Sequence, residues 1–76
     1  MGIFGKLFGS PMARLKHAAE QGDSSAQVTI GILYDNGNGF VQDHAEALKW
    51  YKLAGAQGDI FAKTHIVMMN KRGQGG

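Results

Sequence analysis

Residues 18–39 read AAEQGDSSAQVTIGILYDNGNG, and 36 positions later residues 54–75 read AGAQGDIFAKTHIVMMNKRGQG. Both stretches contain the triplet Gln-Gly-Asp, and small or apolar residues match on either side of it. The matched positions are Ala18 with Ala54, Gln21-Gly22-Asp23 with Gln57-Gly58-Asp59, Ala26 with Ala62, Ile30 with Ile66, Gly37 with Gly73 and Gly39 with Gly75. Self-similarity at this period is typical of helical-hairpin solenoids, so the sequence predicts a repeat fold.

Capping and turn residues divide the chain into four expected helices. They run from Ser10-Pro11 to Gly22, from Ser24 to Asn36, from His44 to Gln57 and from Ile60 to Asn70. The last three helices each follow an aspartate, Asp23, Asp43 or Asp59, whose carboxylate can accept hydrogen bonds from free backbone N–H groups. Asp43 with Glu46 three residues later indicates a variant of the capping box. Residues 71–76 are expected to form a tail that nothing holds in place.

The expected core combines small and large side chains. Gly31 lies inside a helix, where glycine costs about 1 kcal/mol relative to alanine, so a neighbouring helix is expected to approach too closely there for a side chain. The bulky core residues are expected to be Trp50, Tyr51, Tyr34, Leu33 and Leu48. These features predict an all-α fold whose neighbouring helices are antiparallel and joined by short turns.

The motif residues resemble the Sel-1-like repeat, a relative of the tetratricopeptide repeat. They are Ala26, Ile30-Gly31, Tyr34, Gly37-Asn38-Gly39, Asp43, Ala47, Trp50-Tyr51, Ala54 and Gln57-Gly58. The resemblance implies an αα-hairpin solenoid fragment within 10–76, with one full repeat at about 23–58 and a half-repeat on each side. It also implies a protein–protein interaction adaptor or scaffold, and such a repeat would suit a bacterial protein.

Composition limits the classes of function. Seventy-six residues allow one small domain, and the absence of cysteine excludes disulfides and thiolate zinc sites. The net charge of +2 comes from scattered residues with no basic run, which argues against nucleic acid as a partner. Binding to nucleic acid would need the basic side chains to gather on one face. They are Arg14, Lys16, Lys49, Lys52, Lys63, Lys71 and Arg72.

The N-terminal segment, residues 1–9, is expected to stand apart from the repeat and to cap its core. Ile3, Phe4, Leu7 and Phe8 form a small amphipathic stripe at helical spacing. The segment has no basic lead and no small-residue cleavage site, so it does not read as a secretory signal. No apolar stretch reaches the roughly 20 residues that span a bilayer. We therefore expect a cytoplasmic protein without membrane insertion.

The sequence contains no recognisable catalytic or metal-binding pattern. His17, His44 and His65 fall on three different expected helices, and no two of them stand at the spacing of a helical metal site. Asp23 and Asp59, like Asp43, precede helices, where capping accounts for a carboxylate. The sequence thus predicts a protein that is not an enzyme and that holds no cofactor or metal ion.

A partner-binding surface is the remaining expectation, because stacked helical hairpins present a concave face. By analogy with tetratricopeptide proteins, its outward positions are Val28, Ile32, Asp35, Phe61, Thr64, Met68 and Lys71, together with Ser25. For Val28 and Ile32 the alternative is that both are core residues. The partner would be another protein or a peptide.

Residues 60–70 form the least ordinary expected helix, because it is apolar on nearly every side, as in a helix covered on two faces. Three covers for its second face are open: a second copy of the chain, a different protein, or the segment 1–9. The alternative function is therefore a small homo-oligomer, such as a homodimer, that associates through this helix.

Overall fold

The computed structural model describes residues 11–37 and 41–73, and these residues form four helices without a strand. The helices are α2 (Pro11–Glu20), α3 (Ser24–Asn36), α4 (His44–Ala56) and α5 (Ile60–Lys71). The all-α prediction is confirmed, and each boundary lies within two residues of the expected one. The N-terminal segment, the expected cap at Ser10, the matched glycine at Gly39 and most of the expected tail lie outside the described residues.

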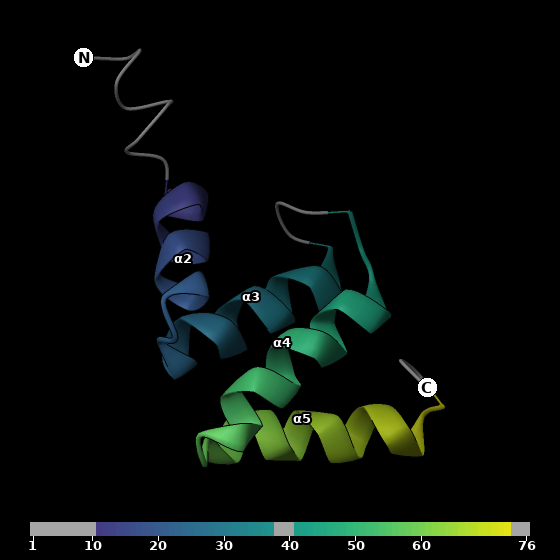
Figure 1. Cartoon of the computed structure of the whole chain (residues 1–76). Helices are drawn as coiled ribbons and strands as arrows, with labels where there is room; N and C mark the ends of the chain where they lie inside the picture. The colour runs from purple at the N-terminus through teal and green to yellow at the C-terminus, as the bar shows by residue number, and fades with distance from the viewer. Residues whose placement is uncertain (1–10, 38–40, 74–76) are drawn as a thin grey trace, which may run out of the picture.

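The helices follow one another in a stack (Figure 1). Helix α3 packs against α2 on one side and against α4 on the other, and α4 in turn packs against α5. Helices α2 and α5 therefore lie at opposite ends of the stack (Figure 1). This order, in which each helix contacts its sequence neighbours, is that of a helical solenoid.

The Gln-Gly-Asp triplets produce the same turn twice. Gly22 and Gly58 have φ angles of 103° and 93°, a left-handed conformation that is costly for other residues. The next residue, Asp23 or Asp59, donates its backbone N–H to the carbonyl of Ala18 or Ala54 at 3.1 and 3.2 Å. This pattern is the Schellman motif, so the period of 36 in the sequence is also a period in the backbone.

The three expected aspartate caps are confirmed. Asp23 Oδ1 accepts the backbone N–H of Ala26 at 3.1 Å, and Asp59 Oδ1 accepts that of Ala62 at 2.9 Å. Asp43 Oδ1 accepts the N–H of Glu46 at 3.0 Å. Each carboxylate satisfies one donor at the start of the next helix, which the backbone leaves free.

The capping box at α4 is only half formed, which corrects the expectation. Its second bond would run from the backbone N–H of Asp43 to the Glu46 carboxylate. That N–H instead donates to the carbonyl of Tyr34 at 2.9 Å and ties the loop to the end of α3. The Glu46 carboxylate turns to Lys49, at 3.8 Å.

The core has two clusters, one on each side of α3. One lies between α2, α3 and α4 and holds Ala19, Ala26, Ile30 and Trp50. The other lies between α3, α4 and α5 and holds Val28, Ala47, Leu48, Tyr51, Ala54, Ala62 and Met69. Of the expected bulky residues, Trp50, Tyr51 and Leu48 are buried, whereas Leu33 and Tyr34 are half-buried.

The prediction for Gly31 is confirmed. A Cβ atom at this position would lie 2.5 Å from Cε1 and 2.7 Å from Cδ1 of Tyr51, closer than atoms in contact can come. Glycine therefore lets α4 lay the ring of Tyr51 directly on the backbone of α3. The fully buried ring fills the space that a side chain would need.

Gln57 connects the two repeated turns. Its side-chain amide donates to the carbonyl of Gly22 at 2.9 Å and to the side-chain oxygen of Gln27 at 3.1 Å. The buried Gln27 amide donates to the carbonyl of Ala19 at 3.0 Å. The second Gln-Gly-Asp turn is thus bonded to the first, which fixes the spacing between successive units.

Candidate partner-binding surface

Helix α5 has one covered face. Ala62 and Met69 are fully buried, and Ile66 packs half-buried against the same cluster. His65 also lies on this side, because its ring stacks on that of Tyr51 with the centroids 4.8 Å apart and the planes 7° from parallel. These residues stand at helical spacing along one side of α5, so they hold the helix in one orientation against α4.

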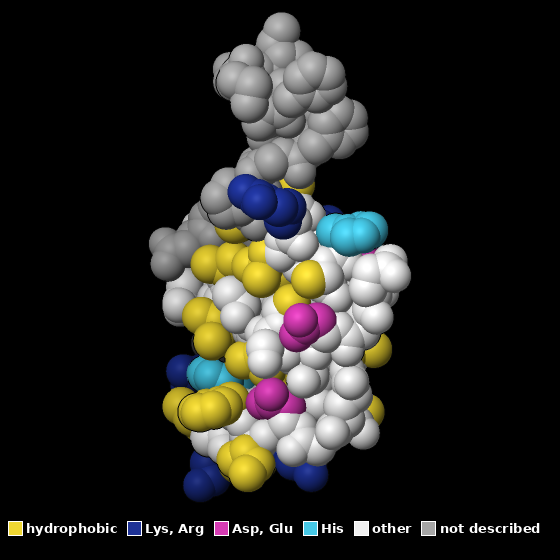
Figure 2. Space-filling view, turned by 90° about the vertical axis from the view of Figure 1, so that its left-hand side faces the viewer, with side chains coloured by type: hydrophobic (Ala, Val, Ile, Leu, Met, Phe, Trp, Pro, Cys, Tyr) yellow, Lys and Arg dark blue, Asp and Glu magenta, His cyan; other side chains and the backbone are white. Residues whose placement is uncertain are grey.

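The other face of α5 is open and apolar. Its large side chains are 76%, 72%, 52% and 44% exposed at Ile60, Phe61, Val67 and Met68, respectively. Thr64 lies on the same face, with its hydroxyl donating to the carbonyl of Ile60 at 3.0 Å. Figure 2 shows hydrophobic side chains beside Lys and Arg side chains at the lower end of the molecule, where the α4–α5 turn lies.

The predicted positions on α5 fall together on this face. Phe61, Thr64, Met68 and Lys71 are all exposed, and their spacing of three or four residues places them on one side of the helix. We call this set, with Ile60 and Val67, the α5 open face. It brings four large apolar side chains and one cation together on a helix whose opposite side is anchored in the core.

The predicted positions on α3 do not form a matching surface. Val28 is 8% exposed and belongs to the core, so the expectation that it faces outward is wrong and the core alternative holds. Ile32 is half-buried against the same cluster. Both pack into the core cluster between α3, α4 and α5, so the side of α3 that tetratricopeptide geometry suggested was open is covered.

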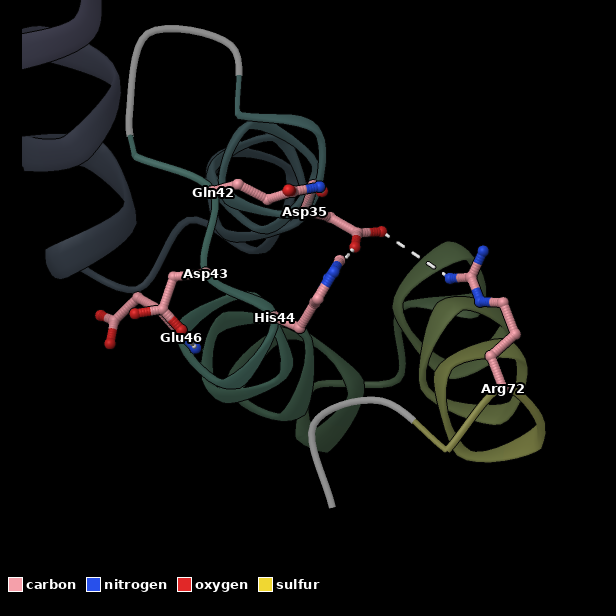
Figure 3. Close-up of polar contacts among 6 residues, drawn as sticks. All are labelled: Asp35, Gln42, Asp43, His44, Glu46 and Arg72. Carbon is pink, nitrogen blue, oxygen red and sulfur yellow. Dashed lines mark hydrogen bonds and ion pairs between the residues drawn. The ribbon is translucent and has the colours of Figure 1, made fainter.

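Asp35 lies at a junction of three helices rather than on an open surface (Figure 3). Its Oδ1 is 2.7 Å from Nδ1 of His44 at the start of α4, and its Oδ2 is 3.9 Å from a guanidinium nitrogen of Arg72 after α5. The Gln42 side-chain amide donates to its backbone carbonyl at 2.8 Å. The Asp35 side chain is only 14% exposed, so it does not face outward as the sequence suggested.

Sequence reasoning missed this junction. The expectation that nothing holds residues 71–76 in place is wrong for Arg72, because its side chain pairs with Asp35. In the sequence, Asp35 lies 9 positions before His44 and 37 positions before Arg72, so no local pattern joins the three residues. Only the packing of α5 on α4 brings Arg72 back to the end of α3.

Tyr51 is a buried residue with a polar group, and its ring packs against α5. Its hydroxyl is buried and makes no hydrogen bond within the described residues. Burial raises the pKa of this hydroxyl to about 12; the negative charge of Asp35 acts in the same direction, and the positive charge of Arg72 opposes it. The group thus stays neutral over the whole ordinary pH range, which suits a packing role.

A second surface feature lies on α4. An open hollow of about 500 Å³ follows the outer side of this helix, lined by Ala45, Leu48, Lys49, Lys52, Leu53 and Ala56. Leu53 is 46% exposed there, and the two lysines stand beside it. All of these residues come from one helix, so the hollow lacks the converging polar groups from several elements that are typical of a small-molecule site.

In the part of the chain that the structure describes, no group of three or more histidine and carboxylate side chains comes together as metal ligands would. His17 is exposed, while His44 and His65 take part in the contacts given above. Among the same residues, no helix combines the length and apolar character needed to cross a bilayer.

Comparison with known proteins gives one relevant similarity. No protein-family model and no solved structure matches the chain. The chain is 30% identical over 70 residues to a sel1-like repeat-containing protein of Acanthamoeba polyphaga mimivirus. The aligned part covers 92% of this chain but 13% of that protein, so the chain spans about an eighth of its relative's length. A sel1-like repeat protein is therefore what this chain is similar to, over nearly all of its residues.

Proposed function

We propose that this chain belongs to the Sel-1-like repeat family and works as a protein-interaction module rather than as an enzyme. Three features support the family: the period of 36 residues, the two identical Gln-Gly-Asp turns, and the similarity to the mimivirus protein. The resemblance brings with it the role of adaptor or scaffold. A cytoplasmic location, as expected from the sequence, fits this role.

The observation that carries the proposal is the α5 open face. A contiguous apolar face on a fixed helix is a typical binding surface for another helix, which inserts side chains spaced by three or four residues. Phe61 and Met68 are the proposed anchors, because they combine large apolar area with high exposure. Thr64 and Lys71 supply the polar edge.

The partner is another protein or peptide that presents an amphipathic helix. The described chain offers no acidic side chain on α5 itself, and Lys63 and Lys71 are exposed on it. A partner with acidic residues beside its apolar stripe would therefore meet favourable charge as well as apolar contact. Aromatic and methionine side chains are common at the centres of such interfaces.

Selection from a displayed library of random 16-residue peptides tests the proposal. The wild-type chain should enrich peptides with apolar residues at helical spacing, and Met68→Glu should weaken their binding at least tenfold by placing a charge in the interface. Lys16→Glu, on the exposed side of α2, is the matched control and should bind as the wild type does. Peptides that bind all three chains equally, or no enrichment at all, would contradict the proposed surface.

A further inference from the structure

We infer that the outer side of α4 is a second docking surface, which binds an acidic amphipathic helix of a partner protein. The surface is the hollow of about 500 Å³ lined by Ala45, Leu48, Lys49, Lys52, Leu53 and Ala56. None of these residues belongs to the α5 open face. The inference therefore goes beyond the proposed function, which concerns α5.

The hollow lies on a side of α4 that its two neighbours in the stack do not take. Helix α4 packs against α3 and against α5, and it turns the fully buried Ala47, Tyr51 and Ala54 toward them (Figure 1). Apart from Leu48, the residues that line the hollow are exposed. They stand at positions i, i+3, i+4, i+7, i+8 and i+11, the spacing with which a helix presents one continuous face to a second helix.

The shape of the hollow suits a helix. Helical spacing places Leu48 and Leu53 at the two edges of this face and the small residues Ala45 and Ala56 between them. The two alanines lie eleven residues apart, which is about three helical turns or roughly 16 Å. Small residues along the middle of a face let a second helix approach closely, so a partner helix of three turns or more fits here.

The charge of the hollow selects an acidic partner. Lys49 and Lys52 are exposed beside its apolar lining, and no acidic residue lines it. Glu46 lies 3.8 Å from Lys49, but both side chains are partly exposed, and such a pair contributes little. Lys52 has no ion-pair partner among the described residues. A helix with Asp or Glu beside an apolar stripe would place both charges opposite cations.

An anionic membrane is the other surface that lysines and leucines bind. Helices that lie on membranes combine a broad apolar face with many cations. On α4 the only large apolar side chain that is exposed is Leu53, and two lysines accompany it. A hollow also receives side chains that project from a helix, whereas a bilayer offers none. A partner helix is therefore the occupant that the surface fits.

Peptide selection on the Met68→Glu variant tests the inference, because the α5 open face is blocked in that chain. From a displayed library of 16-residue peptides, this bait should enrich sequences with apolar residues at helical spacing and Asp or Glu beside them. An enriched peptide labelled with fluorescein should bind Met68→Glu at least tenfold more tightly than it binds Met68→Glu/Leu53→Glu or Met68→Glu/Lys52→Glu. Adding Lys16→Glu, a charge reversal on the exposed side of α2, should leave the affinity unchanged.

A charge exchange tests the acidic character of the partner. When the acidic residues of the enriched peptide are replaced by lysine, it should lose binding to Met68→Glu. The same lysine peptide should bind the chain that carries Lys49→Glu and Lys52→Glu together with Met68→Glu. Recovery in this pair shows that the peptide meets these two lysines, which a general loss of stability would not produce.

Three results would overturn the inference. They are no enrichment by Met68→Glu, enriched peptides that bind equally well after Leu53→Glu and after Lys52→Glu, and binding to vesicles of phosphatidylcholine and phosphatidylserine that Leu53→Glu abolishes. The proposed function is judged separately, by the peptides of the wild-type selection that Met68→Glu weakens. Circular dichroism checks that each variant is helical, and Lys52→Glu decides the test if Leu53→Glu loses helix.

Discussion

At the scale of single residues, Tyr51 shows how one side chain serves several contacts. Its ring lies on Gly31 of α3 and stacks with His65 of α5, so it holds both neighbouring helices to α4. Its hydroxyl is carried into the core without a hydrogen bond among the described residues. An unsatisfied buried hydroxyl costs about 1–3 kcal/mol of stability, so the packing of the ring against α3 and α5 must offset this cost.

The raised pKa of Tyr51 predicts a loss of stability in alkali. An unfolded tyrosine has a pKa of about 10, and the folded residue has one of about 12. Tyr51 therefore holds its proton more tightly in the folded state than in the unfolded state. The contribution of this group to the stability of the fold is fully present below pH 10 and is lost as the pH rises from 10 to 12. The loss should be about 2 kcal/mol at pH 12, somewhat below the full effect of two pKa units because water is near every group in so small a protein.

Urea unfolding of the wild type and Tyr51→Phe at pH 8 and pH 12 measures this loss. The variant lacks the titrating group, so its stability should fall less over the same interval, and the difference between the two proteins isolates Tyr51. At pH 8 the variant should be as stable as the wild type or more stable, because it removes the unsatisfied hydroxyl. Equal losses in the two proteins would show that Tyr51 is not buried as described.

At the scale of helices, two glycines on facing elements predict opposite effects of the same substitution. Gly31→Ala should lower the free energy of unfolding by about 1–2 kcal/mol, because the clash with the Tyr51 ring outweighs the gain in helix propensity. Gly55→Ala should raise it by about 0.5–1 kcal/mol, because its Cβ would make ordinary contact with Ile66 Cδ1 at 3.4 Å. Chemical denaturation checks both, and stabilisation by Gly31→Ala would contradict the close approach of α3 and α4.

The helices were predictable because their signals are local. Each capping aspartate acts on the first turn of the helix that follows it. A glycine inside a helix, such as Gly31, predicts that another helix comes close, but the sequence does not say which one. The junction at Asp35 was not predictable, because its partners His44 and Arg72 meet it only after the stack has formed. Whether Val28 faced outward or inward depended likewise on where α4 lies, which the spacing on α3 alone cannot decide.

At the scale of the whole molecule, the chain is a stack in which each helix has a place defined by the repeat. Helix α3 has both sides covered, whereas α5 has one side covered and the corresponding second side exposed. We therefore predict function from this exposed face: the α5 open face binds a helix of a partner protein. This claim concerns the exposure of one face of one helix.

Thiol labelling measures that exposure most directly, because the chain has no cysteine and a single introduced thiol reports one position. Val67→Cys places the thiol on the α5 open face, and Ala62→Cys places it on the buried side of the same helix. The thiol at position 67 should react at least a hundredfold faster than that at position 62, because the first position is exposed and the second is fully buried. Equal rates at the two positions would contradict the account.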